Sequence, residues 1–223
     1  MTNNIKLLQL EAEVTCCFRC PRLVAFRETV PSRPSWQSQP HWRKPVPGFG
    51  DPNAWLLITG LAPSAQGGNR TGRIFTGDGS AKFLIDALYR AGFANQSHSD
   101  TRDDGLLLKG CFITASVKCV PPENKPTKEE ILNCHSWYEQ ELALLPNLKA
   151  ILALGKIALE TVAFTSRKLH GKGPAVKFAH GWEYAFTGLP PVYACYHPSP
   201  QNTNTGVLTM EMMLALLQTI KSR

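Results

Sequence analysis

The stretch AWLLIT, residues 54–59, followed by Gly60, decides the fold of this chain. Its apolar residues run on without polar alternation, which is typical of a strand buried on both faces of a sheet. Similar runs return at 111–119 (CFITASVKC), 149–154 (KAILAL) and 191–196 (PVYACY). Because helical segments separate these runs, they predict a mostly parallel sheet with helices on both faces.

Helices are predicted between and around the strands, at 4–14, 80–91, 127–145, 155–164 and 207–221. The clearest start is Thr127-Lys-Glu-Glu130, a capping box in which the hydroxyl accepts the Glu130 amide and the Glu130 side chain reaches back. Ligands of such sheets bind beyond the carboxyl ends of the strands. We therefore expect the functional residues to follow Thr59, Cys119 and Tyr196.

The segment 30–53, VPSRPSWQSQPHWRKPVPGFGDPN, holds six prolines in 24 residues, which excludes a regular helix or a central strand. A structureless stretch of this length is usually functional or a linker. Because Trp36, Trp42 and Phe49 argue against a solvated linker, we expect this Pro-rich segment to pack on the protein surface.

Composition is that of an ordinary globular protein, with 43% hydrophobic and 18% charged residues. No run approaches the length of a transmembrane helix, so no membrane partner is expected. The first residues lack the features of a secretory signal, which predicts a cytoplasmic protein. The 24 Lys and Arg against 17 Asp and Glu give a net charge of +7, and the excess lies in 1–50 and 161–223. Basic ends of this kind suit a protein that grips a polyanion, with solubility alone as the alternative.

Seven cysteines in a cytoplasmic chain indicate metal ligands or catalysts before disulfides. Their spacing offers four thiolates to one tetrahedral site: Cys17 and Cys20 in a CxxC knuckle, then Cys119 and Cys134. Spacing does not separate zinc from an iron–sulfur cluster, and scattered core thiols are the alternative. Cys16 could replace Cys17, although the CxxC spacing favours Cys17, and Cys111 and Cys195 are expected to be small core residues.

The first loop at the expected ligand-binding edge is GLAPSAQGGNRTGRIFTGD, residues 60–78, with five glycines in 19 residues. Glycines let the backbone approach a ligand closely. The loop lacks the Gly-Lys-Ser/Thr of a Walker phosphate loop. Phe75 lies in a polar, glycine-flanked stretch, so a stacking platform for a base is as good an interpretation as a core residue.

The second loop is YHPSPQNTNTG, residues 196–206. His197 comes directly after the last strand, at the edge where a ligand would lie, and a catalytic and a structural role are both open. Two prolines stiffen the turn, and the small polar residues that follow offer donors to phosphates.

Taken together, these motifs resemble the uracil-DNA glycosylase superfamily. The resemblance rests on the CxxC pair, GLAP at 60–63, GRIFTGD at 72–78, VKC at 117–119 with PPENKP after it, Cys134, and HPSP at 197–200. Within the superfamily, the chain is similar to the iron–sulfur branch and specifically to family 5, the type B uracil-DNA glycosylases. Family 4 has a glutamate in its first motif, where this chain has Leu61 and Ala62, and a base-reading asparagine where it has Ala115.

The resemblance implies one domain over residues 1–223, built as a three-layer α/β/α sandwich around a four-stranded parallel sheet. It also implies a structural [4Fe–4S] cluster on the four cysteines, Cys17, Cys20, Cys119 and Cys134. The implied partner is DNA, from which a monomeric enzyme excises uracil. A flipped nucleotide would enter a pocket where Phe75 stacks on the base.

The resemblance further implies that neutral His197 and the loop amides from Gly60 through Leu61 to Ala62 stabilise the departing base. Ala62 stands where several relatives carry the Asp or Asn that positions water. Asp78 could take this role, with capping of the following helix as the alternative. Asn124, in PPENKP, is the candidate for a remaining amide contact with the base.

Fewer fixed polar groups in the pocket predict weaker discrimination, so hypoxanthine and xanthine should be excised alongside uracil. No lysine is placed in these loops for Schiff-base chemistry, which predicts a monofunctional enzyme that leaves an abasic site. The alternative is a non-enzymatic metal-cluster module that binds nucleic acid and has no need of His197 or Phe75.

Overall fold

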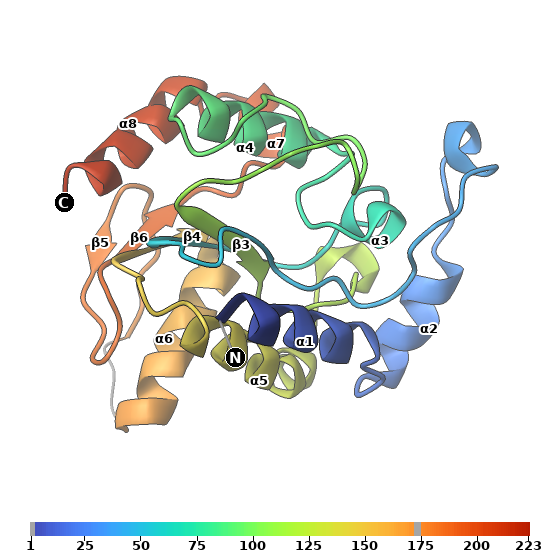
Figure 1. Ribbon diagram of the computed structural model, residues 1–223, viewed down its shortest axis with the longest axis horizontal. Helices are drawn as coiled ribbons and strands as arrows, with labels where there is room; N and C mark the ends of the chain where they lie inside the picture. Colours follow the sequence, from blue (N-terminus) through green and yellow to red (C-terminus); the bar gives the residue numbers. More distant parts are fainter. Residues whose placement is uncertain (1–2, 172–174) are drawn as a thin grey trace.

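A six-stranded sheet forms the centre of the computed structural model, which describes residues 3–171 and 175–223. The strand order is β1-β3-β2-β4-β6-β5 (Figure 1). The four middle strands are parallel, as predicted: β3 (Cys111–Ala115), β2 (Leu56–Gly60), β4 (Ala150–Leu154) and β6 (Val192–Cys195).

The expectation of a sheet with only four parallel strands is wrong, because two short strands extend it at the edges. Strand β1 (Phe49–Gly50) pairs antiparallel with β3, and β5 (Glu183–Tyr184) pairs antiparallel with β6. Pairings of two residues are too short to leave an alternating or apolar run in the sequence. Strand β1 also lies in the Pro-rich segment, where proline is compatible with an edge position but not with a central one.

Helices cover both faces of the sheet, which gives the three predicted layers (Figure 1). One face packs against α4 (Gly79–Arg90) and α8 (Met210–Lys221), and the other against α5 (Lys128–Ala143) and α6 (Lys156–His170). Helix α1 (Asn3–Thr15) packs on α5. Within β2, Leu56 and Ile58 enter one core cluster and Leu57 enters the other, which is why the run is apolar throughout.

Several element boundaries differ from the sequence prediction. The third strand along the chain ends at Ala115, so Cys119 lies in a loop and not at a strand end. Beyond Ala115 the main chain pairs with other loops, since Val117 donates to Leu61 O and Lys118 O accepts from Val46. Three short helices were not predicted: α2 (Pro21–Thr29), α3 (Gly68–Thr71) and α7 (Pro200–Asn204).

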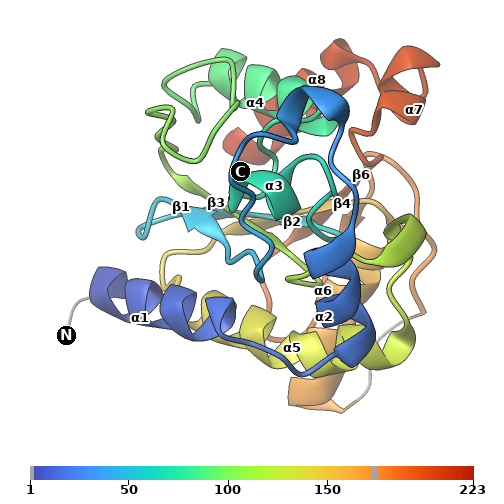
Figure 2. The same cartoon turned by 90° about the vertical axis from the view of Figure 1, so that its right-hand side faces the viewer.

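The Pro-rich segment packs along the 60–78 loop, as expected for a surface segment that is not a linker. Trp42 N donates to Arg70 O at 2.9 Å and Arg43 N donates to Asn69 O at 3.0 Å. Figure 2 shows this segment in blue beside α3. Over the residues that the structure describes, none of the helices has both the length and the apolar character required to span a bilayer.

Candidate functional site

The turn after β2 brings backbone and an aromatic ring into close contact. Gly60 O and Leu61 O accept hydrogen bonds from Ser116 N and Val117 N, both at 3.0 Å, which fixes the turn. A Cβ atom at position 60 would lie 3.0 Å from the Phe75 ring. Glycine is therefore needed here because the Phe75 ring sits directly against the main chain.

Phe75 lies on the core side of the site and also faces the second loop. Its side chain is buried, and its backbone has a φ of 49°, an unusual value for a bulky residue. The ring centroid is 6.1 Å from that of His197, with 31° between the planes. The Phe75 ring is therefore packed in the core and also borders the carboxyl edge of the sheet, where a ligand would bind.

The main chain of His197 is fixed, and the residue as a whole is half-buried. The His197 carbonyl accepts from Asn202 Nδ2 and from Ser199 N, both at 2.8 Å. Burial lowers the pKa of His197 below its ordinary value, and the negative charge of Asp78 partly opposes this shift. A lowered pKa favours the neutral form of the imidazole.

Asp78 has the capping role, one of the two alternatives that the sequence left open. Its Oδ1 accepts from Ala81 N at 2.8 Å, so Asp78 is the N-cap of α4. Its Oδ2 accepts a short hydrogen bond from Ser64 Oγ. The carboxylate also acts electrostatically on His197, so capping does not remove it from the site.

His180 is a residue that the sequence reasoning missed. Its Nδ1 accepts a hydrogen bond from Tyr196 N at 3.2 Å, and its ring stacks on Tyr196 at 5.1 Å. It therefore holds the main chain immediately before His197. Burial lowers the pKa of His180, which keeps Nδ1 free to accept. A single histidine in an irregular stretch carries no sequence signal of this role.

The remaining predicted residues are more scattered. Asn124 is exposed on a 3-10 turn, and in the described part of the chain no hydrogen bond joins it to Phe75, His197 or Asp78. Ala62 packs against the cluster of apolar side chains near the cysteines. The structure therefore brings Gly60, Phe75, Asp78 and His197 together and leaves Asn124 apart.

A groove of about 800 Å³ opens beside Asp78. Its far wall carries Trp36, whose ring has the Arg70 guanidinium at 4.2 Å and that of Arg33 at 5.3 Å. Arg70 is buried, and no carboxylate within the described ranges forms an ion pair with it. Burial lowers the pKa of Arg70, so an anion bound in the groove would stabilise its charge.

The four predicted ligands lie together: Cys17, Cys20, Cys119 and Cys134 line one cavity near the start of α2. Each sulfur accepts one N–H from a different residue, namely Trp137 Nε1 to Cys17 (3.4 Å), Asn133 Nδ2 to Cys20 (4.0 Å), Arg27 Nη1 to Cys119 (3.3 Å) and Lys118 N to Cys134 (3.2 Å). Such a complete donor set favours negatively charged sulfur.

The other three cysteines lie outside this group. Cys111 and Cys195 lie in the main core, as predicted, while Cys16 is exposed. Burial raises the pKa of the Cys119 thiol to about 11 and that of Cys134 to about 12, so an added positive charge is needed to form their thiolates. Across the described residues, no three His, Cys, Asp or Glu side chains converge as they would on a single metal ion.

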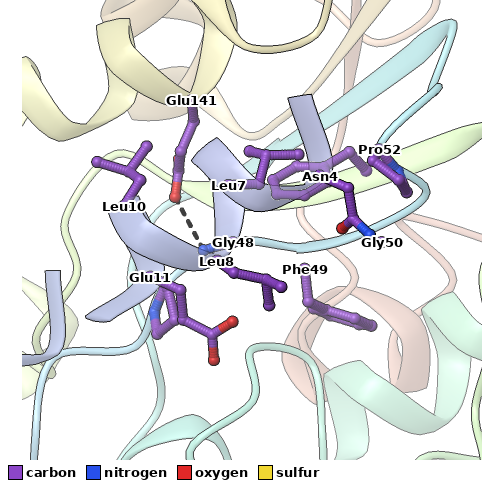
Figure 3. Close-up of a pocket in the computed structure, with 12 residues that line it drawn as sticks. Asn4, Leu7, Leu8, Leu10, Glu11, Gly48, Phe49, Gly50, Pro52 and Glu141 are labelled. Carbon is purple, nitrogen blue, oxygen red and sulfur yellow. Dashed lines mark hydrogen bonds between the residues drawn. The ribbon is translucent and has the colours of Figure 1, made fainter. Parts of the chain in front are cut away.

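A separate pocket of about 200 Å³ lies between α1 and the strand β1 region (Figure 3). The Glu141 carboxylate at its wall accepts from Gly48 N at 2.8 Å and pairs with Lys118 Nζ at 2.6 Å. Both partners of this ion pair are buried. Glu141 therefore links α5 to the Pro-rich segment, and its charge is already compensated.

The α/β sandwich, with a glycine-rich loop, an aromatic ring and a histidine at the carboxyl edge of its sheet, is the arrangement that the resemblance to the uracil-DNA glycosylase superfamily implies. The chain belongs to the uracil-DNA glycosylase superfamily, whose family model ("Uracil DNA glycosylase superfamily") matches residues 47–221. Within it, a "Type-5 uracil-DNA glycosylase" of Thermus thermophilus is 49% identical over 211 residues, 93% of this chain and 94% of that protein.

A second type-5 relative, from Pyrobaculum aerophilum, is 47% identical over 203 residues, which are 91% of this chain and 86% of that protein. A "Type-4 uracil-DNA glycosylase" of Sulfurisphaera tokodaii is only 26% identical over 201 residues, 86% of this chain and 77% of its own length. The expected resemblance to family 5 is thus confirmed.

Proposed function

We propose that the Phe75–His197 edge is the active site of a DNA repair enzyme. The chain is a uracil-DNA glycosylase, which hydrolyses the N-glycosidic bond of uracil in DNA, and we infer that it acts as a monomer and leaves an abasic site. The observation that carries this assignment is the placement of Phe75 against Gly60 and within 6.1 Å of His197, in a member of this superfamily.

The base must leave the duplex before it can reach this edge, since a stacked base is inaccessible. Phe75 offers a ring face to the flipped base, and stacking of this kind contributes about 1–3 kcal/mol with any base. Breaking the glycosidic bond leaves a positively charged sugar and an anionic base. Neutral His197 and the amides from Gly60 to Ala62 donate to the oxygen on which this negative charge develops.

Water attack on the sugar needs a group that orients the water. Ala62 has no polar side chain, and Asp78 is the carboxylate whose negative charge acts on His197. We assign this role to Asp78, which keeps its second oxygen on Ser64 while it caps α4. The groove with Arg33 and Arg70 supplies cations for the phosphates that flank the flipped nucleotide.

We also propose that the four cysteines hold a [4Fe–4S] cluster. Three features support this fit: the shared cavity, an N–H donor on each of the four sulfurs, and the buried Arg27 Nε, which has no hydrogen-bond partner among the residues that the structure describes. When bound, the cluster supplies a structural cross-link between the start of α2, the loop at Cys119 and α5.

Substrate breadth follows from the small side chains around Gly60. Ala62 and Ala115 present no hydrogen-bonding groups, so a different base leaves few of the enzyme's polar groups unpaired. We therefore propose that hypoxanthine and xanthine are excised as well as uracil.

One assay tests these proposals together. The purified protein is incubated with duplexes that contain U·G, U·A, hypoxanthine or xanthine, and alkali then converts each abasic site into a strand break. Breaks at uracil support the glycosylase, and breaks at the two purines support the wider range. Binding without breaks on any substrate would favour the non-enzymatic module.

A further inference from the structure

A buried cation lies at the four-cysteine site, where its guanidinium carbon also lies 4.8 Å from the Phe18 ring centroid. Arg27, in α2, is 1% exposed. Its Nη1 donates to Cys119 Sγ at 3.3 Å and to Cys17 O at 3.0 Å, while its Nε has no partner among the described residues. The nearest carboxylate, that of Glu28, is half exposed and 4.0 Å away. A buried guanidinium is costly unless it is paired, so the charge on these sulfurs matters to Arg27.

The main chain of the same residue is bonded to the loop that carries Asp78. Asn69 Nδ2 donates to Arg27 O at 3.0 Å, and Asn69 is 1% exposed. Asn69 N donates to Ser64 O at 3.0 Å. Ser64 Oγ in turn donates to Asp78 Oδ2. An unbroken series of contacts therefore runs from Cys119 through Arg27, Asn69 and Ser64 to Asp78.

We propose that Arg27 and Asn69 are positioning residues that couple the four-cysteine site to the active site. With the sulfurs charged and bound, Arg27 holds its place, Asn69 fixes residues 64–69, and Ser64 aims the Asp78 carboxylate. This inference rests on the proposed function, because it concerns the residue assigned to orient water. It gives the cysteine site a second role besides stabilising the fold.

Proximity along a series of contacts does not by itself demonstrate coupling, so the test must measure an interaction energy. Asn69→Ala cuts the bond to Arg27 O, and Ser64→Ala cuts the last contact before Asp78. Both variants and the double variant are compared with wild type as intact, coloured protein. Asn95→Ala controls for the loss of one such bond, because Asn95 Nδ2, at an exposed position outside the series, also donates to a main-chain carbonyl at 3.0 Å, that of Gly105.

Four readouts separate positioning from general damage: visible absorbance, thermal unfolding, duplex binding, and single-turnover excision of uracil. We expect Asn69→Ala to keep its colour and its duplex affinity and to lose about 10-fold in excision rate. The double variant should lose little more than either single variant, because all interrupt one series. Hydrogen exchange of residues 64–78 should speed up in Asn69→Ala and not in Asn95→Ala.

Fully additive rate losses, or an unchanged exchange rate in residues 64–78, would overturn the coupling. If Asn69→Ala does not fold, Asn69→Ser, which leaves a smaller cavity and still cuts the bond, takes its place. A wild-type protein that never cleaves uracil-containing DNA would instead refute the proposed function. If the wild type is active and the Asn69 variant is equally active, only the proposed coupling is refuted.

Discussion

The polar groups of the four-cysteine site are paired and buried, whereas those of the His197 edge are partly exposed. Around the cysteines, every sulfur has an N–H donor, and the charged neighbours Arg27 and Lys118 are each 1% exposed. At the edge, His197 and Asp78 are partly exposed, and a groove opens beside them. The difference indicates that the first region is built to hold itself together and the second to meet a ligand.

The largest expected effect is loss of the fold when the cysteine site is broken. Cys119→Ala should give colourless, poorly soluble protein, because structural metal sites supply folding free energy on the order of 10 kcal/mol. Cys195 is even more deeply buried but lies in the main core, so Cys195→Ala should cost only about 1 kcal/mol. Iron content, visible absorbance and urea unfolding measure the contrast. Brown, stable Cys119→Ala protein would contradict it.

The next effect tests the buried ion pair beside that site. Lys118→Met leaves the Glu141 carboxylate buried without its cation, which should lower the free energy of unfolding by about 3–5 kcal/mol. Lys125 pairs with Glu123 on the surface, where both side chains are largely exposed, so Lys125→Met should leave stability unchanged. Equal urea midpoints for the two variants would show that the interior pair contributes nothing.

At the His197 edge of the sheet, a substitution is expected to lower excision activity and not stability. His197→Ala should lower uracil excision by roughly 10²–10³-fold and leave duplex binding nearly intact, because the donor acts mainly on charge that develops in the transition state. Single-turnover rates and a binding titration separate the two. Equal losses in binding and turnover would reassign His197 to structure.

The sequence alone predicts the strands of this sheet because each is a short apolar run buried on both faces. It cannot predict β1 and β5, whose two-residue pairings depend on tertiary contacts with β3 and β6. The end of the strand at Ala115 is also not visible in the sequence, because Ser116 and Val117 continue the run of small and apolar residues beyond it.

The residues of the candidate site likewise fall into those that the sequence predicts and those that it does not. Gly60, Phe75, Asp78 and His197 stand at strand ends or in glycine-rich loops, so motif and position indicate them. Arg27, Asn69 and His180 act through single hydrogen bonds to distant main-chain or sulfur atoms, and no local pattern marks such partners. Asn124 is predicted from its amide, and the fold places it on an exposed turn, where its contact with a base stays a prediction.

The smallest and most discriminating change is Asp78→Asn. Asparagine caps a helix nearly as well as aspartate, and its Nδ2 can donate to Ser64 Oγ, so unfolding should shift by less than about 0.5 kcal/mol. The neutral side chain orients water poorly, and we expect excision to fall about 10-fold. Unchanged excision with unchanged stability would leave Asp78 as a cap, and main-chain groups would then have to hold the water.

The same variant also reports on the charge that reaches His197. Burial holds the pKa of His197 below 6.5, and the Asp78 carboxylate raises it again in part. Removing the carboxylate should therefore move the His197 titration, followed by NMR of the ring protons, to lower pH. Since folding lowers this pKa, the unfolded chain binds the proton more readily, so the histidine weakens stability as pH falls below about 6.5 and contributes no pH dependence well above it. An identical midpoint in both proteins would mean that Asp78 does not act on His197, and the cysteine-side series of contacts would then end at a helix cap.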